Sequence, residues 1–315
     1  MRICISGASG FIGSSLLTKI ENRGENALAL TRNPLKWKQG SNAVYWFEHY
    51  LASPSMNLVD EIKGTDVVVH LAARVHVLDE KLADPLPEFR KVNVDGTLNF
   101  ARQAAEAGVK RFIFISSIGV HGNQNTRPFT VHDAPNPVEP YAVSKLEAEQ
   151  ELRQLADATG MELVAIRPPL VYGPNAPGNF GRLVRLVHKG LPLPLGLVRN
   201  KRSLVALDNL VDLILTCTQH PAAAGQTFLV SDGEDLSTPE LIHKLASAMG
   251  RPARLLPVPL ALLRLGGTIT GKKAEVDRLI GSLQVDIGHT CDTLSWQPPV
   301  SVHDAIVEIG RSWED

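Results

Sequence analysis

The chain of 315 residues is long enough for two domains, or for one domain with a large appendage. Its 32 Lys and Arg residues balance 33 Asp and Glu residues, so an overall footprint for nucleic acid or an anionic membrane is not expected. The three cysteines, Cys4, Cys217 and Cys291, lie far apart and without metal-ligand spacing. They predict buried thiols in a reducing cytoplasm, and neither a disulfide scaffold nor a metal site.

The sequence shows no apolar stretch that is long enough to predict a membrane-spanning helix. The chain starts MRICISGASG, which lacks the apolar run and cleavage site of a signal peptide. The most apolar later stretch, Leu255 to Leu265, is short and contains two prolines and Arg264. It predicts a buried or interdomain helix, with contact to a membrane surface as the less favoured interpretation. We therefore expect a globular cytoplasmic protein that does not insert into a membrane.

Short apolar runs alternate with amphipathic stretches through the first half of the chain. Strands are predicted at residues 2–6, 27–31, 44–47, 67–70, 111–115 and 163–166, and helices at 11–22, 86–107 and 141–159. The strands are apolar on both faces, which is typical of buried parallel strands. Regular alternation of strand and helix predicts an α/β fold with a Rossmann-like, doubly wound parallel sheet.

After Arg167 the pattern changes to a proline-rich, loop-rich stretch. A helix at 210–218, a strand at 226–230 and helices from Thr238 onward are predicted next. The resulting division assigns residues 1–168, with roughly 203–230, to a dinucleotide-binding domain. Residues of roughly 169–202 and 231–315 form a smaller, discontinuous lobe that closes over the carboxyl edge of the sheet.

A glycine-rich turn, Gly-Ala-Ser-Gly-Phe-Ile-Gly, follows the first predicted strand directly. Gly7 allows a tight turn, Gly10 allows close approach of a pyrophosphate, and Gly13 allows the next helix to pack on the sheet. The helix N-terminus adds N–H donors and the positive end of the helix dipole. Because the turn lies between a strand and a helix, it predicts a dinucleotide site that also includes Ser9, Phe11 and Ile12.

The end of the second predicted strand selects the cofactor. An acidic residue there would bind the ribose of NAD, but the chain has Thr31 and Arg32. Arg32 suits a 2′-phosphate, so NADP(H) is preferred and NAD(H) is possible. The alternative is that Arg32 is a solvated loop residue.

Three hydroxyl and amine side chains form a candidate catalytic group. Tyr141 and Lys145 are four residues apart in a predicted helix and therefore share a face. A neighbouring ammonium is expected to lower the pKa of the tyrosine, which then donates or accepts a proton during hydride transfer. Ser116 and Ser117 follow a predicted strand, at the edge where ligands bind in open α/β sheets.

These features resemble the extended short-chain dehydrogenase/reductase family, which contains NAD-dependent nucleotide-sugar epimerases, dehydratases and reductases. The resemblance covers essentially the whole chain. Its markers are Gly7 to Gly13, His70-Leu71-Ala72-Ala73, Asn93-Val94-Asp95-Gly96-Thr97, Ser117 to Gly122, Tyr141 with Lys145, Arg167-Pro168 and Val171-Tyr172-Gly173-Pro174.

The resemblance implies a role for each matching residue. Tyr141 would be the general acid/base, Lys145 would bind the nicotinamide ribose and tune Tyr141, and Ser117 would bind the reacting sugar oxygen. His121 stands where the family usually has a tyrosine, and we interpret it as a packed or exposed loop residue. Cofactor contacts are further implied for Leu71, Ala72, Ala73 and Pro168.

In the C-terminal part, the resemblance implies a nucleotide-diphosphate site. Asn179 and Arg202 match residues that meet the diphosphate, and Arg278 is proposed as a second diphosphate or ribose contact. The implied substrate is a UDP-linked hexose or N-acetylhexosamine. Family members usually form dimers through the helices at 86–107 and 141–159, so a homodimer is expected.

Several chemistries are open to such a site. Dehydratases of the family carry an Asp-Glu pair after the catalytic hydroxyl residue, whereas this chain has Ile118 and Gly119. The favoured interpretation is an NADPH-dependent 4-reductase of a UDP-4-keto-6-deoxy-N-acetylhexosamine, as in bacterial O-antigen synthesis, because residues 73–77 and 204–210 resemble those enzymes. The alternatives are a 4-epimerase with bound NAD and a non-catalytic NADP sensor. Glu147 and Glu149, two apart on a helix, face different ways and are not a glycosidase pair.

Overall fold

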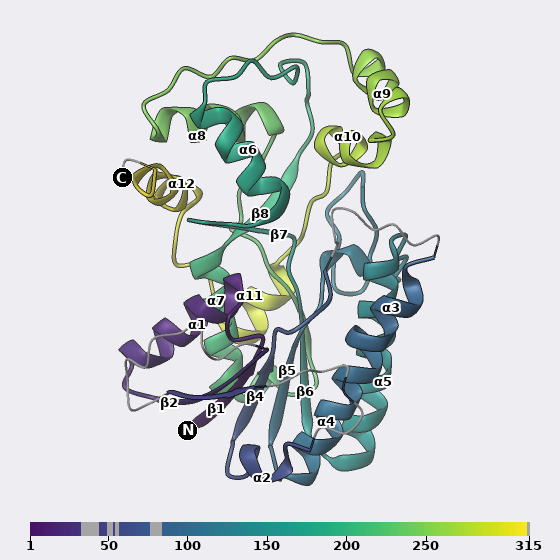
Figure 1. The fold of residues 1–315 in the computed structure, drawn as a ribbon, viewed down its shortest axis with the longest axis vertical. Coiled ribbons are helices and arrows are strands. Elements are labelled where there is room, and N and C mark those ends of the chain that lie inside the picture. Colours follow the sequence, from purple (N-terminus) through teal and green to yellow (C-terminus); the bar gives the residue numbers. More distant parts are fainter. Residues whose placement is uncertain (33–43, 49–52, 54–56, 76–83, 314–315) are drawn as a thin grey trace.

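A computed structural model describes residues 1–32, 44–48, 53, 57–75 and 84–313, with the backbone alone at 44–48. His76 and Val77, which belong to one of the resembling stretches, lie outside the described residues. The molecule has two lobes, one above the other in Figure 1, and the C-terminal part of the chain contributes to both.

The larger lobe is built on a seven-stranded, fully parallel sheet in the order β3-β2-β1-β4-β5-β6-β9. The predicted Rossmann-like fold is confirmed. Both the first and the last residue of each strand predicted for this sheet lie within one residue of the observed boundary. The chain reverses its direction of winding between β1 and β4, which is where such sheets bind ligands. The strands are β1 (Arg2–Ser6), β2 (Asn26–Thr31), β3 (Val44–Glu48), β4 (Val67–His70), β5 (Arg111–Ile115), β6 (Glu162–Arg167) and β9 (Thr227–Leu229).

Helices cover both faces of this sheet (Figure 1). Alternate residues of β1 divide between two apolar cores, because successive strand side chains point to opposite faces. Ile3 and Ile5 lie in the core with α1 (Phe11–Asn22) and α7 (Leu207–Gln219), whereas Cys4 lies in the core with α4 (Thr97–Glu106) and α5 (Pro140–Thr159). Shorter elements around the sheet are α2 (Val59–Ile62), α3 (Leu86–Arg90), α11 (Gly288–Leu294) and the 3-10 turns Ile118–Val120 and Pro221–Ala223.

The helix predicted at 86–107 is interrupted, so that prediction is wrong in its middle. A π-helical turn over Lys91–Gly96 separates α3 from α4. The wider turn carries Asn93, whose amide reaches the Arg74 backbone and the Ser144 hydroxyl. Apolar periodicity alone does not reveal such a turn, because the flanking helices keep their buried faces.

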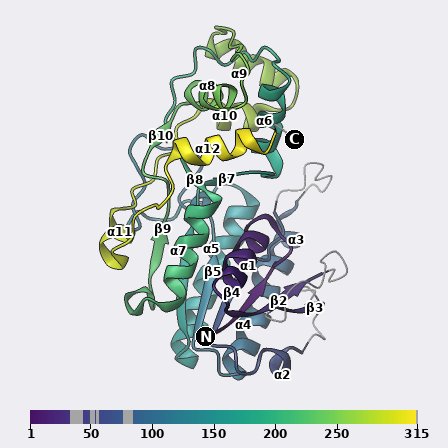
Figure 2. The same cartoon turned by 90° about the vertical axis from the view of Figure 1, so that its left-hand side faces the viewer.

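The smaller lobe contains a three-stranded sheet, β10-β8-β7, beneath a group of helices (Figure 2). Two features differ from the predicted domain division. β8 belongs to this small sheet although residues from 203 onward were assigned to the other domain, and Leu294 and Trp296 pack in the core of the larger lobe. The elements are β7 (Leu170–Tyr172), β8 (Arg202–Ala206), β10 (Asp235–Leu236), α6 (Gly178–His188), α8 (Thr238–Ala248), α9 (Leu260–Ile269), α10 (Lys273–Ile280) and α12 (Val302–Arg311).

The apolar stretch at 255–265 does not form the buried helix that we expected. Its helix, α9, begins only at Leu260, and one face packs through Leu263 and Gly267 toward Val276 of α10. The opposite face is exposed, with Leu262 at 57%. Apolar side chains lie on more than one face of α9, but only one of these faces packs against the rest of the lobe. Within the described residues, none of the helices combines the length and the apolar character needed to cross a bilayer.

Candidate active site

The glycine turn after β1 is held in place by neighbouring strands. Gly7 has φ +74°, a conformation that favours glycine, and its N–H donates to the Leu30 carbonyl at 3.1 Å. A Cβ on Gly7 would lie 2.7 Å from the Ala72 nitrogen, and a Cβ on Gly13 would lie 2.4 Å from the Gly7 carbonyl oxygen. Both glycines are therefore required sterically by a turn that packs on the end of β4.

Three polar residues gather where this turn meets the end of β2. The Thr31 hydroxyl donates to Ser9 Oγ at 2.7 Å, and the next residue, Arg32, is exposed. Helix α1 begins at Phe11 with Gly10 as its N-cap residue, so the first N–H groups of the helix have no partner within it. The arrangement offers an anion both a helix N-terminus and a nearby guanidinium.

The segment after β4 closes the other side of the turn. Leu71 donates its N–H to Ser6 at 3.1 Å, and Ala72 contacts Gly7, as the short virtual Cβ distance indicates. Asn93 accepts from the Arg74 N–H at 2.7 Å and donates to Ser144 Oγ at 3.0 Å. The π-helical turn thus ties the β4 end to helix α5.

Ser117 lies in a tight turn at the carboxyl end of β5. Its Oγ accepts from the Gly119 N–H at 3.1 Å, while Ile118 donates its N–H to the buried Pro168 carbonyl at 2.9 Å. A Cβ on Gly119 would lie 3.3 Å from both Ser117 Oγ and Ala142 Cβ. Ser117 therefore lies beside the first turn of α5. Its neighbour Ser116 is buried, and its Oγ has no hydrogen-bond partner within the described part of the chain.

Tyr141 and Lys145 occupy successive turns at the start of α5. The Tyr141 ring lies 6.2 Å from that of Phe89, and burial raises the pKa of Tyr141 to about 12. Lys145 is buried with its Nζ 3.9 Å from the centre of the Phe114 ring, and burial lowers its pKa to about 7. The expected lowering of the tyrosine pKa is therefore wrong for the protein alone, because desolvation is the effect that shifts it.

A buried charge network continues the same helix face by one more turn. Glu149 accepts from Arg167 in a bidentate ion pair, with Nε–Oε1 at 3.0 Å and Nη2–Oε2 at 2.5 Å. Arg167 Nη1 also donates to His121 Nε2 at 2.8 Å. The negative charge of Glu149 raises the pKa of Lys145 and so opposes part of the effect of burial.

The pairing of Glu149 with Arg167 in this network was not predicted from the sequence. The 141, 145, 149 spacing, which continues one helix face, is the signal that would have found Glu149. His121 is buried and stacks on Phe129, as a packed loop histidine does. Burial and the positive charge of Arg167 lower the pKa of His121 to about 4, consistent with a neutral ring that accepts at Nε2.

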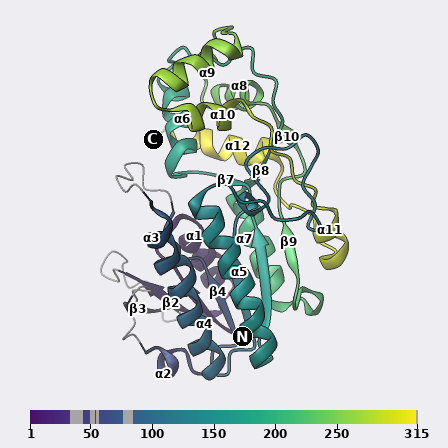
Figure 3. The same ribbon diagram turned by 90° about the vertical axis from the view of Figure 1, so that its right-hand side faces the viewer.

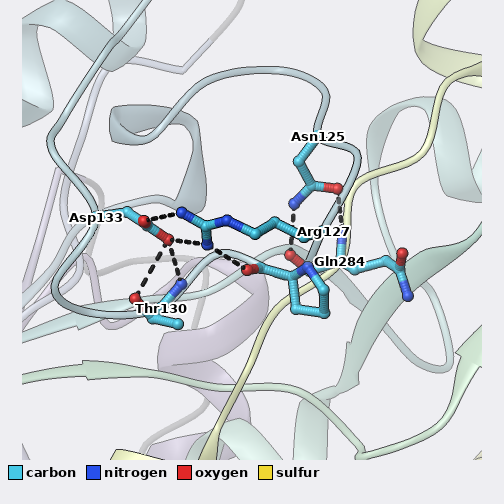
Figure 4. Close-up of polar contacts among 6 residues, drawn as sticks. Asn125, Arg127, Thr130, Asp133 and Gln284 are labelled. Carbon is cyan, nitrogen blue, oxygen red and sulfur yellow. Dashed lines mark hydrogen bonds and ion pairs between the residues drawn. The ribbon is translucent and has the colours of Figure 1, made fainter.

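The loop between Ser117 and Tyr141 is fixed to the C-terminal lobe (Figure 4). Asn125 makes two hydrogen bonds with the backbone of Gln284, at 2.7 and 2.9 Å. Arg127 pairs with Asp133, which also accepts from the Thr130 N–H at 2.7 Å. The catalytic candidates therefore lie at the ends of a loop that is held by its own polar contacts and by the backbone of Gln284.

The predicted diphosphate residues are only partly brought together. Arg202 donates to the carbonyls of Arg278 and Gly281, and burial together with the charge of Arg278 lowers the pKa of Arg202. Arg278 itself pairs with Glu139, two residues before Tyr141, so phosphate contact by Arg278 would require this ion pair to open. Asn179 lies exposed at the start of α6 and makes no hydrogen bond to either arginine in the described structure.

A family model described as the NAD dependent epimerase/dehydratase family matches residues 3–231. The chain is 45% identical over 314 residues to a UDP-glucose 4-epimerase of Vibrio cholerae, covering 99% of this chain and 95% of that protein. It is 30% identical over 286 residues to an N-acetyl-alpha-D-glucosaminyl-diphospho-ditrans,octacis-undecaprenol 4-epimerase of Escherichia coli O157:H7, covering 87% of this chain and 82% of that protein.

Among solved structures, similarity extends over the full fold. A UDP-glucose 4-epimerase from Thermotoga maritima with UDP-glucose matches with a TM-score of 0.80 and 20% identity, covering 100% of this chain and 99% of that one. A UDP-N-acetylglucosamine 4-epimerase from Bacillus cereus matches with a TM-score of 0.81 and 20% identity, covering both chains completely. At this identity the structures support the fold.

Proposed function

Because the chain is an enzyme of the NAD dependent epimerase/dehydratase family, we propose that it interconverts the C4 epimers of UDP-linked hexoses or N-acetylhexosamines with NAD as a resident cofactor. The observation that supports the proposal is that Ser117, Tyr141 and Lys145 lie at the same carboxyl edge of the sheet as the glycine turn, in a chain with a full-length epimerase relative. The 4-epimerase, the alternative in the sequence analysis, thereby replaces the 4-reductase as the favoured function.

The residues around the glycine turn fit a nicotinamide dinucleotide. Gly7 and Gly13 leave no room for side chains because the turn packs on Ala72 and on its own backbone, and this fixes its tight conformation. A turn of this kind at a helix N-terminus suits a pyrophosphate. The unpartnered Ser116 Oγ provides a buried polar atom at the same edge of the sheet. We propose that the turn and the segment Leu71 to Ala73 hold the cofactor, with Lys145 toward its ribose.

A bound NAD would supply reversible hydride transfer, taking a hydride from sugar C4 and giving it back to the opposite face of that carbon. Tyr141 Oη takes the proton of the C4 hydroxyl during oxidation and gives it back during reduction. Ser117 Oγ hydrogen-bonds the same oxygen in both directions, and the Lys145 ammonium stabilises Tyr141 when it is anionic. Oxidation at C4 is followed by reduction on the opposite face of the same carbon, so the product would be the 4-epimer and no net oxidation of the sugar would occur.

The diphosphate of the substrate is assigned to the arginines at the base of the C-terminal lobe. The guanidinium of Arg278 pairs with the carboxylate of Glu139, whereas the printed hydrogen bonds of the neighbouring Arg202 guanidinium go to the backbone carbonyls of Arg278 and Gly281. This local excess of positive charge favours a polyanion, and guanidinium groups bind phosphate in a bidentate manner. Asn179 stays a proposed third contact from the start of α6.

The second candidate is an NADPH-dependent 4-ketoreductase acting on a UDP-4-keto-6-deoxy-N-acetylhexosamine. The specific observation in its favour is the end of β2, where Thr31 replaces an acidic residue and Arg32 is exposed beside the glycine turn. An arginine in this position suits NADP(H) rather than NAD(H).

The proposal is tested by incubating the purified protein with UDP-glucose and, separately, with UDP-N-acetylglucosamine, and separating the 4-epimers by chromatography. We expect the 4-epimer to accumulate to a constant ratio without added NADPH. Formation of no epimer from either substrate, with an intact folded protein, would contradict the proposal.

A further inference from the structure

The tip of the C-terminal lobe, defined here as residues 189–199 and 251–273, is one continuous surface feature. Its two segments lie side by side, because Leu193 donates its N–H to Arg254 at 2.8 Å and Gly196 donates its N–H to Leu256 at 2.9 Å. Helix α9 belongs to this lobe tip and lies at the end of the molecule opposite to the N-terminus (Figure 3). The lobe tip therefore projects away from the large sheet.

Apolar side chains are concentrated on the lobe tip. On α9, Leu262, Leu265 and Ile269 are 57%, 55% and 76% exposed, and their spacing of three and four residues puts them on one face. Six of the eleven exposed large hydrophobic residues in the described part of the chain lie in the lobe tip, the others there being Leu191, Leu197 and Leu256. A patch of this kind marks a surface that meets another apolar phase.

Positive charge is concentrated on the same surface. The lobe tip contains seven Lys and Arg residues and no Asp or Glu residue, in a chain with a net charge of −1. Arg264 pairs with Asp277 at 3.7 Å. The other six make no ion pair within the described residues, namely Lys189, Arg199, Arg251, Arg254, Lys272 and Lys273.

We propose that the lobe tip docks on the surface of an anionic phospholipid membrane. Amphipathic helices with an apolar face and basic flanks bind there, because the apolar side chains enter the headgroup boundary while the cations meet lipid phosphates. A second copy of the chain is a poorer occupant, since a two-fold contact through the lobe tip would bring two basic surfaces together. The contact is peripheral and involves no spanning helix.

The experiment is co-sedimentation of the full chain with vesicles of phosphatidylglycerol mixed with phosphatidylcholine, and with vesicles of phosphatidylcholine alone. We expect binding to the anionic vesicles only, weakened by high salt. The double substitutions Leu262→Asn/Leu265→Asn and Lys272→Gln/Lys273→Gln should each lower the vesicle affinity by about tenfold or more.

The control is Lys63→Gln/Lys110→Gln, which removes two exposed lysines from the opposite end of the molecule and should leave vesicle affinity unchanged. Circular dichroism of every variant checks the fold independently of any activity. No sedimentation of the wild-type chain with anionic vesicles would overturn the proposal. A dimer in ultracentrifugation that dissociates in Leu262→Asn/Leu265→Asn would also overturn it, by assigning this face to a second copy.

Discussion

Tyr141 is held at the start of α5 with its ring against Phe89 and its hydroxyl in surroundings that favour the protonated form. In the proposed reaction this oxygen alone exchanges a proton with the substrate, so its removal leaves binding intact and removes acid/base assistance. Tyr141→Phe should lower turnover by about two to four orders of magnitude, as loss of a general acid does. Steady-state kinetics, with dinucleotide affinity measured in parallel, checks this; wild-type turnover would contradict the assigned role.

The neutral state of His121 predicts a pH dependence of stability. Burial and the charge of Arg167 lower the pKa of His121 in the folded protein to about 4. As the pH falls below the ordinary histidine pKa, the unfolded chain therefore binds a proton at His121 before the folded protein does. This contribution to stability is complete above about pH 6.5 and is lost toward pH 4. We expect it to reach at most about 3 kcal/mol.

Urea unfolding of wild type and His121→Phe between pH 7 and pH 4 measures this contribution. The substitution should flatten the fall in unfolding free energy with decreasing pH, whereas His303→Gln, on the exposed surface of α12, should follow the wild-type curve. Parallel curves for wild type and His121→Phe would show that His121 does not carry the effect.

Two glutamates of helix α5, two residues apart, form one buried and one exposed ion pair. Glu149 and Arg167 are both almost fully buried, whereas Glu147 and Arg90 pair at the surface. Glu149→Gln leaves a buried guanidinium without its counter-charge and should lower the free energy of unfolding by about 3 kcal/mol or more. Glu147→Gln is the matched control and should change it little. Denaturant unfolding compares the two, and equal effects would refute the role given to burial.

The turn before α1 predicts a steric effect on cofactor binding. Gly13→Ala would press a methyl group onto the Gly7 carbonyl and displace the turn, so dinucleotide affinity should fall by about tenfold or more. Gly266→Ala in α9 is the control, because a Cβ added there would meet no atom of another part of the chain within 4 Å. This substitution should leave dinucleotide affinity unchanged. Fluorescence titration with NADH measures both. Unchanged binding by Gly13→Ala would mean that the turn does not hold the dinucleotide.

The strands and most helices of the larger lobe were predictable because their apolar patterns are local. The placement of the glycine turn, Ser117, Tyr141 and Lys145 at the carboxyl edge of the sheet was also predictable, because each follows directly from the end of a strand or the start of a helix. The roles given to these residues stay predictions. The π-helical turn at Asn93 and the partner of Arg167 were not, because both depend on contacts between segments distant in sequence. The exposed face of α9 was missed for the same reason, as composition does not reveal which apolar face lacks a partner.

At the scale of the whole molecule, two lobes meet around the loop that joins Ser117 to Tyr141. The apolar faces of α4 and α5 are used in the core of the larger lobe, and none of the exposed large hydrophobic residues in the described structure lies on these helices. The homodimer through α4 and α5 therefore stays a prediction. The overall charge balance likewise conceals the basic lobe tip, since acidic residues elsewhere offset it.

The most direct test of the proposed 4-epimerase is the reaction of UDP-glucose carrying deuterium at C4, with protein purified without added cofactor. The mechanism predicts that the 4-epimer forms with deuterium retained at C4, because the hydride leaves and returns within one active site, and that nicotinamide absorbance shows no net change. Absence of the 4-epimer, together with stoichiometric oxidation of NADPH by a UDP-4-keto-6-deoxy-N-acetylhexosamine, would contradict the account and establish the reductase.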